Sequence, residues 1–303
     1  MEEIFVSIVI YLHNNESMIS SYLNQLYEVV SRRFKNYEVI FVDDASSDNT
    51  SANLDWDGRS ASTLVKLNVH HGVELAMNAG VNLAVGDYVY EIDTVEAKYP
   101  FDILEKSYNL ALEGHDIVNI CPTKMSGASR LFYKVFNRYS NSVYEIKTEV
   151  GRIVSRRAIN RVQATNETQL YRKAAYAACG LKQTDIYFEG DGSVVQEGRF
   201  DLCINSLILY TDMGFKVSTG ITVFMIIVSL MELIYTIVVY LTGKPIEGWT
   251  TTMLVISFGF TGLFTLETII IKFLSLVLDL NFNRQRYKVE SVEKLMNRKE
   301  NSI

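Results

Sequence analysis

Cysteine is scarce in this sequence, with only Cys121, Cys179 and Cys203 among 303 residues. The number is odd and the residues lie far apart, which excludes the dense disulfide framework of small secreted domains. The spacing also differs from that of cysteine metal ligands. The cysteines therefore indicate reduced thiols in a cytosolic compartment.

The chain also lacks an excess of positive charge. The chain has 29 lysine and arginine residues against 35 aspartate and glutamate residues, which gives a formal net charge of −6. Proteins that bind nucleic acids depend on clustered positive charge to neutralise phosphates. The composition therefore predicts no nucleic-acid partner.

The first half of the chain alternates between strand and helix patterns. Short apolar, β-branched runs at 5–12, 37–44 and 63–69 predict buried strands. Segment 72–87 predicts a helix that leads into a further strand at 88–92. Strands separated by helices form a mostly parallel sheet, so the predicted fold class is α/β, with ligands bound beyond the carboxyl edge of the sheet.

Polar residues follow three of these predicted strands. Residues 13–16 follow the first strand, and the pair Asp43-Asp44 ends the second. Asp93 directly follows the strand at 88–92. Because the carboxyl ends of parallel strands lie at one edge of a sheet, we expect these side chains to gather there and form a functional site.

A second carboxylate is missing beside Asp93. A cation that holds a diphosphate often takes a further carboxylate two residues along, and this position is Val95. Glu96 offers a longer side chain for the same purpose, since Mg²⁺ needs only one or two protein carboxylates beside phosphate oxygens. Glu91 shares a strand face with Asp93, and Lys98 would be a fixed positive charge in place of the cation. We expect an altered but working site.

Two long apolar runs lie near the C-terminus, at 217–241 and 249–280. A bilayer core of about 30 Å needs about 20 helical residues, and both runs exceed that length. The segment after residue 280 is rich in lysine and arginine, which are enriched on the cytoplasmic side of membranes. We therefore expect two transmembrane helices, with the N-terminal domain and the C-terminus both cytoplasmic.

The predicted domain organisation has four parts. A cytosolic domain spans 1–198, an amphipathic juxtamembrane segment spans 199–216, a two-helix hairpin spans 217–280, and a basic cytoplasmic tail spans 281–303. Within the first domain, residues 129–141 carry apolar side chains at helical spacing, flanked by cations. This pattern is typical of an interfacial helix on a membrane or of an ordinary amphipathic helix packed on its domain. The downstream spans favour the membrane.

Four stretches carry a resemblance to a known family: VSIVIYLHNNES, YEVIFVDDASSDNT, GVELAMNAGVNLAVGDYV and SRLFYKVFNRYS. They resemble the membrane-anchored family-2 glycosyltransferases. More narrowly, they are similar to the polyprenyl-phosphate glycosyltransferases related to dolichol-phosphate mannose synthase and the bactoprenol glucosyltransferases. The resemblance implies a GT-A domain, which binds a nucleotide sugar, followed by two transmembrane helices.

The resemblance also implies which residues bind the donor and its cation. The implied nucleotide-sugar-binding residues are Tyr11, His13, Asn15, Asp43, Asp44 and Asp93. The family motif D-x-D corresponds here to Asp93 and Val95. Asp93 and Glu96 are therefore the candidate ligands of a Mg²⁺ or Mn²⁺ ion.

A second motif of the family, D-F-R-L-x-x-R-R, is similar to EVGRIVSRR at 149–157. The resemblance implies catalytic roles for Glu149 and Arg152 beside Asp93. It also implies that Arg156 and Arg199 bind the phosphate of the acceptor.

The implied function is inverting transfer of a hexose from a nucleotide sugar to a membrane lipid, with polyprenyl phosphate as the expected acceptor. The implied setting is surface-polysaccharide or lipid-linked sugar synthesis at the bacterial cytoplasmic membrane, carried out by a homo-oligomer such as a tetramer. The altered motif positions support a second hypothesis. In that hypothesis the chain is a nucleotide-binding membrane scaffold or regulatory subunit without catalysis.

Overall fold

The computed structural model describes residues 4–54, 61–140, 142–164, 171–191 and 289–295, together with isolated positions between 203 and 277. The chain divides into two compact units. The first comprises 1–138, 142–203 and 285–303, and the second comprises 139–141 and 204–284. The predicted functional residues within the described ranges all belong to the first unit.

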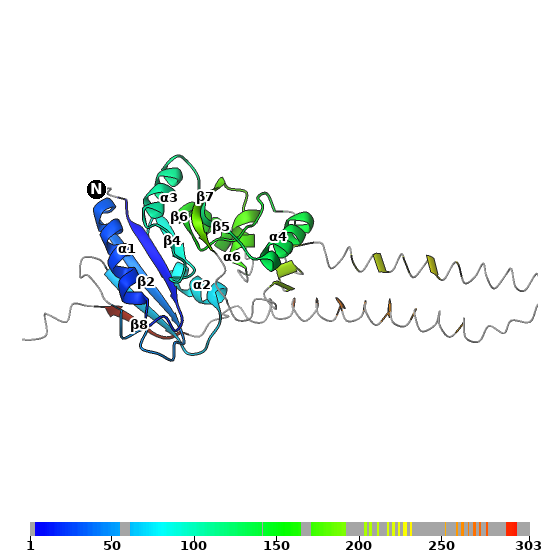
Figure 1. The fold of residues 1–303 in the computed structure, drawn as a ribbon, viewed down its shortest axis with the longest axis horizontal. Coiled ribbons are helices and arrows are strands. Elements are labelled where there is room, and N and C mark those ends of the chain that lie inside the picture. Colours follow the sequence, from blue (N-terminus) through cyan, green and yellow to red (C-terminus); the bar gives the residue numbers. More distant parts are fainter. Residues whose placement is uncertain are drawn as a thin grey trace, which may run out of the picture. The chain divides into compact units, whose positions relative to one another are not determined.

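The described part of the first unit contains an eight-stranded sheet (Figure 1). Its strands are β1 (Val6–Leu12), β2 (Tyr37–Asp44), β3 (Ala61–Leu67), β4 (Tyr88–Ile92), β5 (Ile117–Lys124), β6 (Gly151–Ser155), β7 (Gln183–Asp191) and β8 (Val289–Leu295). Their order across the sheet is β7-β5-β6-β4-β1-β2-β3-β8. Strands β6 and β8 run antiparallel to their neighbours, and the other pairs are parallel. The mostly parallel α/β sheet predicted from the sequence is confirmed.

The helices of the described ranges cover both faces of this sheet. They are α1 (Ile19–Arg33), α2 (Val73–Leu83), α3 (Asp102–Leu112), α4 (Gly127–Tyr139), α5 (Arg156–Ala164) and α6 (Arg172–Ala178). Apolar residues of α1 and α3 form one buried cluster with one face of the sheet. Apolar residues of α2, α5 and α6 form a second cluster with the other face. Strands β1 to β6 contribute apolar side chains to both clusters, so these strands are covered on both sides.

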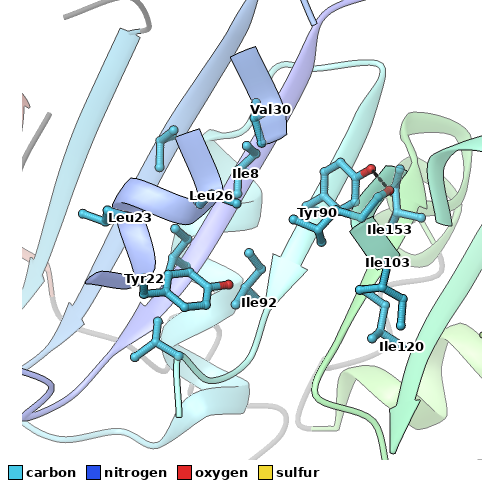
Figure 2. Packing of buried hydrophobic residues seen from close by; sticks show 14 of the residues in the cluster. Ile8, Tyr22, Leu23, Leu26, Val30, Tyr90, Ile92, Ile103, Ile120 and Ile153 are labelled. Carbon is cyan, nitrogen blue, oxygen red and sulfur yellow. Dashed lines mark hydrogen bonds between the residues drawn. The ribbon is translucent and has the colours of Figure 1, made fainter. Parts of the chain in front are cut away.

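Strand β1 shows how the sequence divides its side chains between the two clusters. Ile8 and Ile10 pack in the cluster of α1 and α3, whereas Val9 packs in the cluster of α2, α5 and α6. Figure 2 shows Ile8 near Leu26 and Val30, which project from α1. Because successive side chains of a strand point to opposite faces, a continuous apolar run fills both layers.

The segment after β4 continues this alternation although it is not a strand. Val95, Ala97 and Tyr99 are buried in the cluster of α1 and α3. Glu96 and Lys98, which lie between them, are exposed. Val95, where the family motif has its second carboxylate, is therefore a core residue that is only 6% exposed.

The C-terminal predictions fall largely on residues that the structure does not describe. The juxtamembrane segment 199–216 and both apolar runs are described only at isolated positions. Within the described residues, no helix has the length and apolar character needed to cross a membrane. In the predicted basic tail, 289–295 forms β8, which pairs antiparallel with β3 from Ser62 to Leu67. The sequence analysis did not foresee this strand, because its apolar residues recur every third position rather than alternately.

Candidate functional site

Three strands end together at the edge where the sequence placed the site. In the parallel pairs of β1, Leu12 lies opposite Asp43 of β2, and Ile10 lies opposite Ile92 of β4. His13 and Asp93 follow these strand ends directly. The polar residues thus meet at the carboxyl edge, as expected for a parallel sheet.

Asp93 makes ion pairs with two buried arginines. Its Oδ2 accepts a hydrogen bond from Nη2 of Arg152 at 3.0 Å, and its Oδ1 accepts one from Nη2 of Arg172 at 2.6 Å. The other terminal nitrogen of each guanidinium, Nη1, donates to Oε2 of Glu91, at 2.7 Å from Arg152. Each arginine therefore bridges the same two carboxylates, and the arginine side chains are only 1% and 2% exposed.

Four further side chains complete this group, which we call the Asp93 cluster. Glu74 of α2 accepts a hydrogen bond from Nε of Arg172 at 3.1 Å, and the hydroxyl of Tyr176 donates to Oε1 of Glu91 at 2.5 Å. Glu149 lies 3.0 Å from Nη2 of Arg152, and Nζ of Lys173 lies 3.8 Å from Glu149. The complete cluster is Glu74, Glu91, Asp93, Glu149, Arg152, Arg172, Lys173 and Tyr176.

The cluster has four carboxyl groups and three cationic side chains, so its charges balance when one carboxyl group is protonated. Burial alone would raise the pKa of Asp93, but Arg172 and Arg152 hold it below its usual value. Burial raises the pKa of Glu149 above its usual value, although Arg152 and Lys173 act in the opposite direction. Within the described residues, Oε2 of Glu149 is buried without a hydrogen-bond partner. Glu149 is therefore the carboxyl group of the cluster that is best suited to hold a proton.

The arrangement around Asp93 does not fit a divalent cation. Both oxygens of Asp93 are engaged by guanidinium groups, and Val95 lies in the core. Glu96, the other predicted ligand, is exposed and accepts a hydrogen bond from Nδ2 of Asn15 at 3.4 Å. In the part of the chain that the structure describes, no group of three or more histidine, cysteine, aspartate or glutamate side chains could hold a metal ion. Lys98, the cation considered in place of a metal, is exposed.

The two carboxylates at the end of β2 hold neighbouring loops. Asp43 accepts hydrogen bonds from the backbone N–H of Ser46 at 2.9 Å and from the hydroxyl of Ser51. Asp44 accepts backbone hydrogen bonds from His71 and Gly72, both at 2.8 Å. Asp43 thus caps the turn after β2, and Asp44 fixes the loop that leads into α2.

Asp44 also brings together residues that the sequence analysis treated separately. The Tyr11 hydroxyl donates to Oδ2 of Asp44 at 3.1 Å, and Nδ1 of His70 lies 3.1 Å from the same oxygen. Nδ1 of His13 lies 2.7 Å from the carbonyl oxygen of Asp44, and the rings of His13 and His70 are 4.2 Å apart. His70 therefore packs beside His13 at the end of β2.

Asn15 joins this group through the backbone. Its Oδ1 accepts a hydrogen bond from the N–H of His13 at 2.8 Å. Its own N–H donates to the hydroxyl of Thr50 at 2.7 Å. Tyr11, His13, Asn15 and Asp44, four of the predicted donor-binding residues, therefore lie in one hydrogen-bonded group.

Arg156, one of the two predicted acceptor residues, does not join the site. Arg156 donates to the carbonyl oxygens of Gly86 and Ala84, at 2.8 Å from Nη2 to each, and these residues precede β4. Because β6 is antiparallel to β4, residues that follow β6 lie at the edge opposite Asp93. The structure therefore separates Arg156 from the strand ends of the site. Arg199 lies outside the described residues.

Helix α4 covers the predicted interfacial segment and packs its aromatic face on the domain. Phe136 is fully buried, and its ring centroid lies 6.2 Å from that of Tyr171. Arg130, Lys134 and Leu131 are exposed, Leu131 by 64%. The aromatic residues thus follow the ordinary amphipathic pattern, which leaves the cations and one leucine on the outer face.

Arg172, Glu74 and Tyr176 were not identified from the sequence as site residues. Arg172 belongs to the short helix RKAAYAA, in which four of the seven residues are alanine. A buried arginine needs carboxylate partners, and a lone arginine on an apolar helical face is the signal that points to them. The partners themselves come from other elements, and Asp93 is 79 positions away.

Comparison with known proteins identifies the family of the chain. Residues 7–175, more than half of the chain, match Glycosyl transferase family 2. The chain therefore belongs to this family of glycosyltransferases. A bactoprenol glucosyl transferase of Shigella phage SfV is 24% identical over 269 residues, which cover 84% of this chain and 87% of that protein.

A solved structure supports the fold. Mannosyl-3-phosphoglycerate synthase from Rubrobacter xylanophilus aligns over 68% of this chain and 72% of its own, with a TM-score of 0.50 and 15% identity, which supports a GT-A-like fold. A glucosyl-3-phosphoglycerate synthase from Mycobacterium tuberculosis, solved with Mn²⁺ and UDP-glucose, covers 68% of this chain and 77% of its own. Its TM-score of 0.47 and identity of 14% are too low to assign that cation to this chain.

The cluster predicts a large loss of stability when Asp93 is neutralised. Asp93→Asn would remove the charged partner of two buried ion pairs, those with Arg152 and Arg172, and breaking a buried pair typically costs about 3–5 kcal/mol. We expect this loss in the free energy of unfolding, measured by denaturant titration followed by circular dichroism. The matched control is Asp102→Asn, whose exposed pair with Lys106 should contribute less than about 1 kcal/mol. Equal losses in the two variants would contradict the assigned role of Asp93.

Glu149 predicts a specific dependence of stability on pH. Because the pKa of Glu149 is raised in the folded state, its contribution to the free energy of unfolding is full below the unfolded pKa of about 4.3. This contribution is lost as the pH rises through the folded pKa. Glu149→Gln removes this loss, so the variant should gain stability relative to the native chain between about pH 4 and 7. The measurement is the melting temperature across this range, with the exposed Glu113→Gln as control. Parallel pH profiles for the native chain and Glu149→Gln would show that the buried carboxyl group is not perturbed.

Proposed function

We propose that this family-2 glycosyltransferase moves a hexose from a nucleotide sugar to a membrane lipid, with polyprenyl phosphate as acceptor. The observation that carries the proposal is the extent of the similarity to the bactoprenol glucosyl transferase. An alignment of 269 residues extends beyond the family-2 region that ends at residue 175. The shared sequence therefore includes part of the C-terminal region, which contains both apolar runs.

The donor would bind at the carboxyl edge formed by β1, β2 and β4. The group around Asp44 supplies imidazole rings and amides for a nucleobase and ribose, and His13 is the half-exposed member beside the exposed Asn14. Asp43 and Asp44 contribute by holding the two loops that flank this position. Their buried hydrogen bonds make the loops rigid, which lowers the entropy lost on binding.

The chemistry of such a transfer depends more on position than on a strong base. The acceptor oxygen of a phosphate is already ionised, so it attacks the anomeric carbon without first losing a proton. The bond from that carbon to the diphosphate breaks, and its electron pair stays on the diphosphate. Glu149, with its raised pKa, would take part only where an acceptor carries a hydroxyl group.

Strand β8 supports a membrane hairpin. The two apolar runs lie between β7 and β8, and both strands belong to the same sheet. A segment that leaves this domain and returns to it must cross a membrane an even number of times. This supports two spans with the domain and the C-terminus on the same side of the membrane, and we propose that this side is the cytoplasm of a bacterial cell. The exposed Arg130, Lys134 and Leu131 of α4 suit a position near anionic headgroups.

A transfer assay tests the proposed reaction. Purified full-length protein is incubated with polyprenyl phosphate and with UDP-, GDP- or dTDP-linked hexoses, and labelled sugar is measured in the lipid phase. We expect transfer with at least one donor, and we expect His13→Ala to weaken binding of that nucleotide by about tenfold or more. The control is His115→Ala, because His115 contacts the carbonyl of Leu110 at the end of α3.

The outcome that contradicts the proposal is nucleotide binding without transfer to any lipid acceptor. That result would favour the second hypothesis, a nucleotide-binding scaffold or regulatory subunit. A specific observation supports the second hypothesis, since both oxygens of Asp93 are already occupied by protein groups. Loss of nucleotide binding in His115→Ala as well as in His13→Ala would contradict the donor position.

The membrane topology has its own test. Cysteines introduced at Lys244, between the apolar runs, and at Asn301, in the tail, are labelled in intact cells with a membrane-impermeant maleimide. We expect Lys244→Cys to be labelled from outside and Asn301→Cys only after the cells are opened. Labelling of both positions under the same condition would contradict a two-span hairpin.

A further inference from the structure

We propose that this protein binds its nucleotide donor without a divalent cation, because two buried arginines occupy the carboxylate that would hold one. The inference rests on the proposed function for the identity of the donor. Its structural part, the exclusion of a cation from Asp93, stands independently of that function. The residues that carry it are Glu91, Asp93, Arg152 and Arg172.

The hydrogen bonds leave no free oxygen on Asp93 for coordination. Arg152 and Arg172 donate to different oxygens of Asp93, at 3.0 and 2.6 Å. A Mg²⁺ ion binds oxygen at about 2.0–2.1 Å, so at either oxygen of Asp93 it would lie beside a guanidinium, which would repel it or have to be displaced. Glu91 offers no alternative, because its Oε2 accepts from both arginines and its Oε1 accepts from Tyr176.

Displacing a guanidinium would leave an uncompensated charge inside the domain. Arg152 and Arg172 are almost fully buried, and Arg172 also donates to Glu74 through Nε and through its backbone N–H. Each arginine makes charge-assisted bonds to three carboxylates, and a displaced arginine would lose them together. An incoming divalent ion would also be repelled by the guanidinium that remained.

The neighbouring positions cannot supply a different set of ligands. Val95 packs among apolar residues of the α1 and α3 cluster, so a carboxylate at this position would be buried without a partner. Glu96 is exposed and contacts Asn15. An exposed carboxylate alone does not hold a cation tightly, since Mg²⁺ sites combine near-octahedral geometry with several ligands. The arginine pair has therefore taken the position of the cation.

The first experiment measures nucleotide affinity by titration calorimetry on the full-length protein. UDP and GDP are titrated in the presence of EDTA and, separately, of Mn²⁺. We expect the dissociation constant for the bound nucleotide to differ by less than about twofold between the two conditions. Tightening by about tenfold or more in Mn²⁺ would overturn the inference.

The second experiment needs no nucleotide and measures the melting temperature of the protein with EDTA or Mn²⁺. We expect no Mn²⁺-dependent rise in the native chain, in Asp93→Asn or in Glu96→Gln. The inference would be overturned if Mn²⁺ raised the melting temperature of the native chain but not that of one of the two variants. If Asp93→Asn does not fold, the comparison with Glu96→Gln still decides the question. Failure to bind any nucleotide in either condition would count against the proposed function, and the melting experiment would still decide whether Asp93 accepts a cation.

Discussion

The double bridge between two arginines and two carboxylates determines how the site is assembled. Glu91 and Asp93 come from the end of β4, Arg152 from β6, and Arg172 from α6. Glu74 attaches α2 to the same group through Arg172. A buried guanidinium tolerates little misplacement, because each lost partner leaves charge in a medium of low polarity. The positions of four elements are therefore mutually dependent, and the loop held by Asp44 is attached to one of them at the start of α2.

The strand ends of the site could be predicted from the sequence because the signals were local. Apolar runs at 5–12 and 37–44 become β1 and β2 with ends shifted by at most one residue. Parallel pairing then placed His13, Asp44 and Asp93 at one edge without further information. The partners of Asp93 could not be predicted in this way. Arg172 lies on a short helix, and nothing in its local pattern specifies which carboxylate it meets.

Arg152 and Arg156 show why a matched motif does not guarantee a shared site. They lie four positions apart in EVGRIVSRR, and the family resemblance implied a catalytic role for Arg152 and binding of the acceptor phosphate for Arg156. Arg152 lies near the start of strand β6, and Arg156 directly follows its end. Because a strand rises about 3.3 Å per residue, the backbone positions of the two arginines lie more than about 10 Å apart. Arg152 pairs with Asp93 at the carboxyl end of β4. Arg156 instead donates to the carbonyl group of Gly86, which precedes the amino end of β4. Similarly, Val95 occupies the second position of the D-x-D pattern but points into the core because the alternation of β4 continues beyond the strand.

Strand β8 has a consequence for how the protein is made. β3 pairs with residues that the ribosome adds only after both apolar runs, so its outer edge stays open during most of synthesis. An open strand edge readily pairs with other chains. Insertion of the apolar runs into the bilayer would keep each nascent chain tethered apart from its neighbours until its own last strand arrives. Completion of the sheet thus depends on the last residues to be translated, and a chain truncated before β8 would leave the outer edge of β3 open to pairing with other chains.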